Sequence, residues 1–346
     1  MTRRLLPKLV LSLALAALFV LLYQRQGVPL VPPREAFGGV RWWTVPAYAL
    51  TLLATHFVRA SRWRFLIAPV KKDIPFWEAI LINWVGFFAI FALPLRLGEM
   101  ARPALTKMRH GVSISVGLGT VAVERVIDGL VTSLCVVWAL VAIPHLPATD
   151  DITRSLPVLG TMAVAAFGGA FFGLALFLWQ RSLAIWLIDA TFGRVSARLG
   201  GWVAGKVADV AEGVRVLAEP RLALGFLGET LLYWGLNAAG MWLLGWGVGL
   251  DLTFGHAVGI MGILAIGILL PAGPGRFGNF QFAVGLARSL YFGASVVGTD
   301  GAVYVFLLYG VQLVLITLAG VIPLYAMNLS FADLLRAPKD ERSSLS

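Results

Sequence analysis

The stretch LPLRLGEMARPALTKMRHG, residues 93–111, lies between two of the most apolar segments of the chain. Its charged residues include Arg96, Glu99, Arg102, Lys107 and Arg109. Both flanking segments have the composition of helices embedded in a membrane. The side of the membrane on which this basic stretch lies therefore decides the topology, and we call residues 94–110 the first break.

The composition of the whole chain is that of a membrane protein. It has 346 residues, of which 59% are hydrophobic and 13% are charged, whereas soluble domains carry roughly 25% charged residues. Apolar runs of nearly membrane-spanning length recur throughout, which predicts an all-α polytopic membrane protein. No polar stretch is long enough for a separate soluble domain, so we expect residues 1–346 to form one membrane domain.

The net charge of +10 has a simpler explanation than nucleic-acid binding. Lys and Arg collect in cytoplasmic loops and favour anionic lipid head groups, and no nucleic-acid recognition module is present. The basic N-terminus runs into an apolar segment that reaches Tyr23 without a small-residue cleavage site, so we expect an uncleaved first span rather than a signal peptide. The single cysteine, Cys135, excludes an internal disulfide.

Hydropathy predicts about six full spans and two further apolar segments. The spans cover approximately residues 5–23, 43–59, 114–143, 156–179, 222–248 and 302–327. The further segments, 76–93 and 255–271, each run into a polar stretch that contains Pro and Gly. Another moderately apolar helix follows each of these stretches.

Basic residues indicate how the spans are oriented. The N-terminus, the stretch 59–72, the stretch 181–221 and the tail 328–346 are basic and are expected in the cytoplasm, and the acidic loop 144–151 outside. If 76–93 crossed the membrane fully, the basic first break would lie outside. A pair of re-entrant hairpins that enter from opposite faces removes this conflict. The alternative is that one segment does not follow the charge rule.

A weak internal symmetry supports the hairpins. The stretches FFAIFALPLRLGEM and ILLPAGPGRFGNF both run from apolar residues through Pro to Arg-x-Gly. In this alignment Arg96, Gly98 and Glu99 correspond to Arg276, Gly278 and Asn279. Broken segments at matching positions are typical of inverted-repeat transporters with a site at the repeat interface, with halves near 5–179 and 180–327. Chance similarity between two such stretches is the alternative.

Three ionisable residues, Glu124, Arg125 and Asp128, lie within the otherwise apolar span 114–143. Each intramembrane charge costs about 2.5–3.5 kcal/mol on insertion scales unless it is paired or hydrated. We therefore expect them inside the bundle, with Arg125 itself, Arg96 or Arg102 as counter-charges. They either form a polar core that meets substrate or a coupled proton, or they form a structural ion pair.

Each break could bind an anion. In the first break, Arg96 and Arg102 can hydrogen-bond a phosphate, and a helix beginning near Glu99 would add a favourable dipole. The alternative is an interfacial loop whose arginines reach towards lipid. In the second break, residues 271–283, Arg276 is accompanied by the hydrogen-bonding Asn279 and Gln281. No Gly-Lys-Ser/Thr follows, so this is not a nucleotide loop.

Catalysis has weaker support in the sequence. A catalytic role would rest on Glu124 and Asp128, and no nucleophile–base pattern accompanies them. The four histidines show no metal-ligand spacing. We therefore expect no catalytic residue, no metal and no cofactor.

The stretch PLRLGEMARPALTKMRHGVSISVGLGTVAVERVIDGL (residues 94–130), followed by PAGPGRFGNFQFA (271–283), resembles the lysylphosphatidylglycerol synthase transmembrane family. The resemblance covers roughly residues 10–327. It implies a flippase-like helical bundle with internal pseudo-symmetry that moves lipids with bulky polar heads between leaflets. It also implies that Pro274, Gly275 and Gly278 belong to the site.

Two departures from the family pattern bear on the substrate. Leu95 stands where a glycine is common, and Gln281 stands where a glutamate is common, which weakens the case for a cationic head group. The soluble synthase domain of related proteins is absent from this sequence, so lysyl-lipid synthesis is not expected of it. The predicted head-group residues are Arg96, Gly98, Glu99, Arg102, Glu124, Arg125, Asp128, Pro274, Gly275, Arg276, Gly278, Asn279 and Gln281.

The sequence therefore favours a lipid translocase of the cytoplasmic (inner) membrane, with both termini inside. With no ATPase motif, movement would be passive, ion-coupled or driven by potential. Expected partners are phosphate-bearing, aminoacylated or glycosylated lipids, a separate lipid synthase or glycosyltransferase, and a second copy of the chain. The alternatives are a membrane-embedded enzyme of lipid or polyprenyl-phosphate metabolism that uses Glu124 and Asp128, or a scaffold for a separate synthase.

Overall fold

The computed structural model describes residues 2–93, 98–144, 146–147, 151–180, 186, 219–270, 273–293, 296 and 298–329. Predicted features at Arg96, in most of the basic stretch 181–221 and in the tail from residue 330 lie outside these residues. Within the described residues the secondary structure is helical, without a strand.

The helices fall into long and short groups. The long ones are α1 (Thr2–Gln24), α2 (Thr44–Ser61), α6 (Ile114–Ala142), α7 (Asp151–Trp179), α10 (Pro220–Gly247) and α14 (Asp300–Ala326). The shorter ones are η1 (Arg34–Phe37), α3 (Trp63–Ile67), α4 (Phe76–Ala92), α5 (Ala101–His110), α11 (Phe254–Gly267), η5 (Pro274–Arg276) and α12 (Asn279–Ser289).

Each of the six predicted spans corresponds to one long helix. By length and composition, four of the described helices could cross a membrane, namely those in α1, α6, α7 and α14. The helices α2 and α10 occupy the other two predicted positions. The prediction of an all-α polytopic membrane protein is confirmed.

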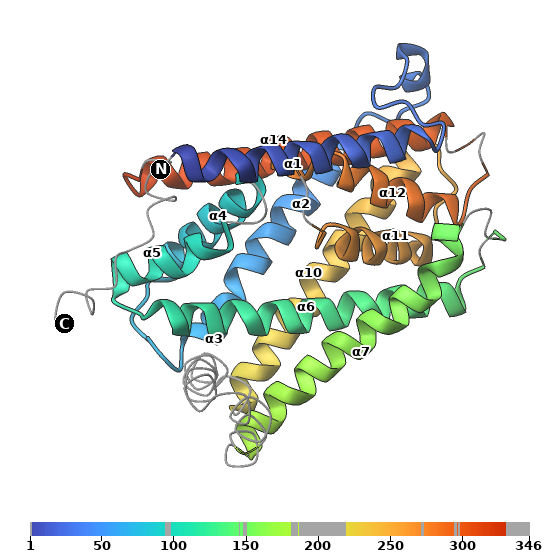
Figure 1. The fold of residues 1–346 in the computed structure, drawn as a ribbon. Helices are drawn as coiled ribbons and strands as arrows, with labels where there is room; N and C mark the ends of the chain where they lie inside the picture. Colours follow the sequence, from blue (N-terminus) through green and yellow to red (C-terminus); the bar gives the residue numbers. More distant parts are fainter. Residues whose placement is uncertain are drawn as a thin grey trace.

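The two further apolar segments form short helices at opposite ends of the bundle. Helix α4 has 17 residues and α11 has 14, or about 26 Å and 21 Å at ~1.5 Å per residue, shorter than the ~30 Å hydrocarbon layer. In Figure 1, α4 and α5 lie at the end where α1 begins, and α11 and α12 lie at the end where α1 finishes. This arrangement agrees with hairpins that enter from opposite faces. The inverted repeat stays a prediction.

Local contacts fix the first hairpin. Residues 98–100 form one helical turn within the first break, and a Cβ atom on Gly98 would lie 2.0 Å from the carbonyl carbon of Ala89. Only glycine allows this close approach to the backbone of α4. At the far end, Gly111 (φ 70°) terminates α5 in the left-handed conformation, and the Ser113 side chain caps α6 by accepting from the Val116 amide.

The second hairpin is closed by two of the predicted site residues. The Asn279 amide nitrogen Nδ2 donates to the carbonyl oxygens of Gly267 and Leu270, at 3.4 and 3.3 Å. These contacts tie the start of α12 to the end of α11. Gln281 Oε1 accepts from the Gly278 amide at 2.8 Å. Both side chains therefore satisfy backbone groups that the break would otherwise leave unpaired.

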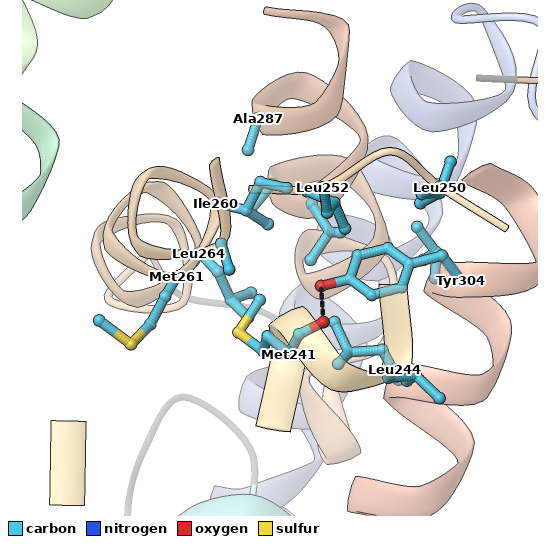
Figure 2. Packing of buried hydrophobic residues seen from close by; sticks show 14 of the residues in the cluster. Met241, Leu244, Leu250, Leu252, Ile260, Met261, Leu264, Ala287 and Tyr304 are labelled. Carbon is cyan, nitrogen blue, oxygen red and sulfur yellow. Dashed lines mark hydrogen bonds between the residues drawn. The ribbon is translucent and has the colours of Figure 1, made fainter. Parts of the chain in front are cut away.

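The largest hydrophobic cluster lies where α10, α11, α12 and α14 meet. Figure 2 shows Tyr304 of α14 in this cluster, with its hydroxyl donating to the carbonyl oxygen of Met241 in α10 at 3.2 Å. Ile260 and Leu264 of α11 lie on the same side of the cluster. This packing anchors α11, and hence the second hairpin, to the long helices.

Candidate functional site

A cavity of about 140 Å³ lies where the two hairpins approach each other. Phe87 and Ile90 of α4 line it from the first hairpin, and Ile268 and Arg276 line it from the second. A Cβ atom on Gly275 would lie 3.6 Å from the Phe91 ring, so the breaks are close neighbours. The remaining polar wall comes from α2, α6, α10 and α14, through Thr55, His56, Arg59, Arg125, Asp128, Thr132, Tyr233, Trp234, Asn237 and Gln312.

Asp128 of α6 forms a buried ion pair with Arg62, which connects α2 to α3. The two guanidinium nitrogens Nη1 and Nη2 each donate to one carboxylate oxygen of Asp128 at 2.7 Å. Arg62 also donates to Thr230 Oγ1 at 2.9 Å, and the Trp234 indole donates to Asp128 at 3.3 Å. Both carboxylate oxygens are thus occupied, which suits Asp128 to a counter-ion role.

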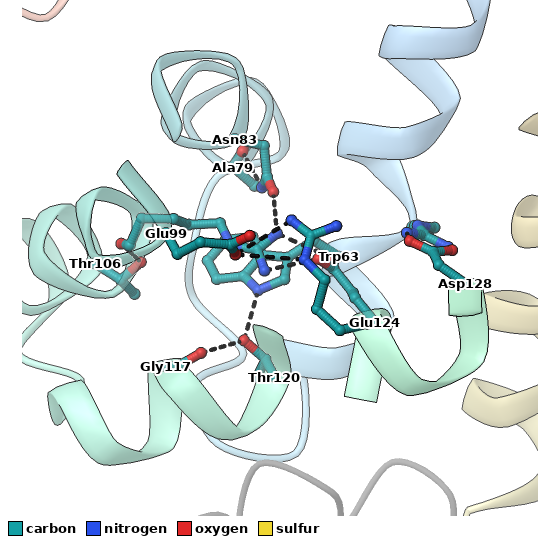
Figure 3. Close-up of polar contacts among 12 residues, drawn as sticks. Trp63, Ala79, Asn83, Glu99, Thr106, Gly117, Thr120, Glu124 and Asp128 are labelled. Atoms are coloured by element: carbon teal, nitrogen blue, oxygen red, sulfur yellow. Dashed lines mark hydrogen bonds and ion pairs between the residues drawn. The ribbon is translucent and has the colours of Figure 1, made fainter. Parts of the chain in front are cut away.

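Glu124, one turn earlier in α6, pairs with Arg102 of α5. Arg102 Nη1 and Nη2 donate to its two carboxylate oxygens at 3.0 and 2.7 Å. Arg102 Nη1 also donates to Asn83 Oδ1 of α4 at 2.7 Å. Figure 3 shows Asn83 and Glu124 converging on this network, with Asp128 further along α6. The network joins both helices of the first hairpin to α6.

Arg125 is the third charged residue of α6, and it is less buried than its neighbours. Its Nε and Nη2 atoms donate to Glu99 Oε2, both at 3.3 Å. The two side chains are 25% and 24% exposed. Arg125 lines the cavity, whereas Glu99 lines a narrow pocket beside it that Arg125 shares. This pair therefore connects the first break, through Glu99, to the cavity wall, through Arg125.

Two more arginines, Arg59 of α2 and Arg276 of η5, line the cavity. The Arg59 guanidinium lies over the Phe87 ring, with its central carbon 4.2 Å from the ring centroid. Arg276 has a positive φ of 56°. A left-handed conformation is uncommon for a residue with a side chain, and Arg276 adopts it within the second break.

Among the described residues, the charges around the cavity do not balance. The described residues that line it include three arginines, Arg59, Arg125 and Arg276, and one carboxylate, that of Asp128. This group therefore carries two more positive than negative charges. In a low-dielectric interior such an excess attracts an anion strongly.

The structure places the predicted site residues in three groups. Arg125, Asp128 and Arg276 line the cavity, and Glu99 and Arg102 line the narrow pocket beside it. The others hold the breaks or the charged helix in place without lining the cavity: Gly98, Glu124, Pro274, Gly275, Gly278, Asn279 and Gln281. Arg96 lies outside the described residues.

Arg102 was one of three counter-charges that the sequence allowed for the charged helix, and in the structure it pairs with Glu124. From the sequence alone, Arg59, Arg62 and Arg64, which flank Trp63, have the composition of ordinary membrane-boundary anchors. That interpretation was wrong for Arg62, which is fully buried on Asp128. The spacing of three residues between Arg59 and Arg62, which places both on one helix face, was the available signal.

The geometry also bears on metal binding. Within the part of the chain that the structure describes, no three His, Cys, Asp or Glu side chains are grouped as metal ligands. The carboxylates of Glu124 and Asp128 already accept from arginines through both oxygens. Their arrangement is that of ion-pair partners.

Comparison with known proteins gives one match. The model of the family described as "Lysylphosphatidylglycerol synthase TM region" matches residues 9–320. No curated protein and no solved structure matches the chain.

Proposed function

The chain belongs to the lysylphosphatidylglycerol synthase TM region family, and from that premise we propose that it is a flippase-like lipid translocase. Family membership by itself suggests a membrane function connected with lipids. The further step to translocation is supported by one observation, the positively charged cavity where two short broken hairpins meet. A polar head group could cross through such a site while its apolar tails stay in the bilayer.

The position of the cavity supports passage from either side. Broken helices at the bilayer midplane are the usual location of a transporter site, because irregular backbone there must line a cavity or be buried in protein. Arg125 of the long helix α6 and Arg276 of the second break both line this space. Phosphate is the group that arginines bind best, through paired hydrogen bonds.

The membrane and the orientation belong to the same proposal. We place the protein in the cytoplasmic membrane with both termini inside, on the support of the basic residues near the N-terminus and between residues 59 and 72. The lipids it moves carry a phosphate in the head group.

Leaflet exchange of fluorescent anionic lipid in proteoliposomes tests this function. The wild type is compared with Arg276→Gln, which removes a charge from the cavity wall. The matched control is Arg64→Gln, because Arg64 is 46% exposed and pairs with Glu229 away from the cavity. We expect at least tenfold slower exchange for Arg276→Gln and an unchanged rate for the control.

The lipids are extracted afterwards and weighed by mass spectrometry. Unchanged lipid masses together with exchange support translocation. A chemically altered lipid would instead identify an enzyme of lipid metabolism. Exchange that the wild-type protein does not accelerate would overturn the proposal and favour a scaffold for a separate synthase.

A further inference from the structure

Arg59 differs from the other arginines of the polar interior in its partners. Arg62, Arg102 and Arg125 each pair with a carboxylate. Among the described residues, Arg59 pairs with none, and its buried Nε atom has no hydrogen-bond partner. Its guanidinium lies against the face of the Phe87 ring. The side chain lies in the last turn of α2 and lines the cavity.

An arginine in this setting is costly to keep without an anion. The guanidinium remains charged at any physiological pH. The Arg59 side chain is only partly exposed, and a charge held there without a paired carboxylate loses part of its hydration. A cation–π contact returns only about 0.5–2 kcal/mol. A ligand anion in the cavity would supply both the missing charge and the missing hydrogen-bond acceptor.

The cavity is poorly suited to a cation. Asp128 is the one carboxylate among its described lining residues, and both of its oxygens already accept from Arg62. Gln281 is a neutral amide, and its side-chain oxygen already accepts a hydrogen bond from the Gly278 amide. A lysyl ammonium would therefore meet three lining arginines and no available carboxylate.

We infer that the cavity selects lipids whose head group is net negative, with a phosphate and no attached amino acid, and that Arg59 is the residue that determines this specificity. The inference rests on the proposed function, since it concerns the same cavity. The phosphate oxygens would accept from Arg59, with Arg125 and Arg276 adding to the positive field. An aminoacylated lipid could make the same phosphate contact. The cavity arginines would repel its ammonium group, however, and this repulsion would cancel the gain.

Equilibrium binding tests the inference without relying on transport. The full-length protein in detergent is titrated with short-chain phosphatidylglycerol, lysyl-phosphatidylglycerol and, as a zwitterionic reference, phosphatidylcholine. We expect phosphatidylglycerol to bind at least tenfold more tightly than either of the others. We expect Arg59→Gln to bind phosphatidylglycerol about tenfold or more weakly, because it loses a charge-assisted hydrogen bond to the phosphate.

Two further variants keep the result interpretable. Arg59→Lys retains the charge and should keep the order of preference, although more weakly, because lysine lacks the planar donor pair. Arg64→Gln should bind like the wild type. Thermal unfolding in detergent checks that each variant is folded.

The outcomes separate this inference from the proposed function. Equal or tighter binding of lysyl-phosphatidylglycerol by the wild type would overturn the selectivity. An unchanged preference in folded Arg59→Gln would overturn the role of Arg59. Selective binding without leaflet exchange would support the inferred selectivity and reject the translocase function. Leaflet exchange without selective binding would support the translocase function and reject the inferred selectivity.

Discussion

Arg62 and Asp128, 66 positions apart in the chain, meet through two parallel hydrogen bonds of 2.7 Å in the interior of the bundle. The arginine is fully buried and the aspartate side chain is 9% exposed. This pair links the α2–α3 junction to α6, and Thr230 adds α10 to the same contact. It therefore fixes one wall of the cavity.

The first prediction concerns the stability of this pair. Asp128→Ala should lower the free energy of unfolding by about 3–5 kcal/mol, because it leaves the Arg62 charge buried without a partner. The measurement is unfolding of the purified protein in mixed detergent micelles. Glu229→Gln serves as control, because it breaks the more exposed pair with Arg64, for which less than about 1 kcal/mol is expected.

Removing both charges separates the effect of the unpaired charge from the effect of altered packing. Arg62→Met combined with Asp128→Leu should recover most of the lost stability, as replacing buried ion pairs by apolar residues often does. A double variant as unstable as Asp128→Ala would show that the loss comes from packing rather than from the unpaired charge.

The second prediction concerns the close approach at Gly98. Gly98→Ala should destabilise the protein by about 1–3 kcal/mol and slow leaflet exchange, because its Cβ would lie 2.0 Å from the Ala89 backbone. Helix α4 or the turn at 98–100 must then shift. Gly169→Ala is the matched control, since a Cβ atom there meets no atom within 4 Å. If both variants exchange lipid at the wild-type rate, the close packing has no functional role.

The third prediction concerns the partner of Arg125. Glu99→Gln removes the carboxylate that Arg125 contacts at 3.3 Å and so raises the net positive charge beside the cavity by one. Short-chain phosphatidylglycerol should then bind a few-fold more tightly, since an additional unpaired charge acts at low dielectric. Binding is measured at two ionic strengths.

Glu35→Gln supplies the comparison for Glu99→Gln. It removes the same charge from an exposed residue of η1 and should leave the affinity unchanged. Weaker binding by Glu99→Gln would mean that Glu99 positions Arg125 for the ligand rather than competing with it.

Much of this fold follows from the sequence, because hydropathy and helix breakers act locally. The spans, the two short segments and the burial of Glu124 and Asp128 could be predicted from apolar length, Pro-Gly breaks and the cost of intramembrane charge. Arg102 was among the three counter-charges expected for the charged helix, although the sequence did not say which carboxylate it would pair with.

The long-range pairing could not be predicted in the same way. Asp128 pairs with Arg62, which lies outside both breaks, at the junction of α2 and α3. The sequence contains several arginines, and nothing in it favours Arg62 as the partner of Asp128. The roles of Asn279 and Gln281 also depended on backbone groups whose orientation only the folded hairpin sets. Arg59 resembled an interfacial anchor because its neighbours, Trp63 and Arg64, have the composition of a membrane boundary.

The last prediction tests the hairpin formed by α4 and α5 directly. If this pair enters and leaves on one side, single cysteines introduced at Lys72 and Met108 should react with a membrane-impermeant maleimide from the same side. Both positions are exposed, and the native thiol is removed by Cys135→Ser. A third cysteine at Val31, which is 70% exposed between α1 and α2, reports the opposite side. Labelling in intact cells and in inverted vesicles gives the two orientations.

Reaction of Lys72→Cys and Met108→Cys from opposite sides would mean that α4 crosses the membrane, and the positive-inside rule would then fail at the first break. Reaction of both from the cytoplasmic side, with Val31→Cys reacting from the other, would mean that the hairpin enters and leaves on one face and that the basic first break stays on the cytoplasmic side, in agreement with the positive-inside rule.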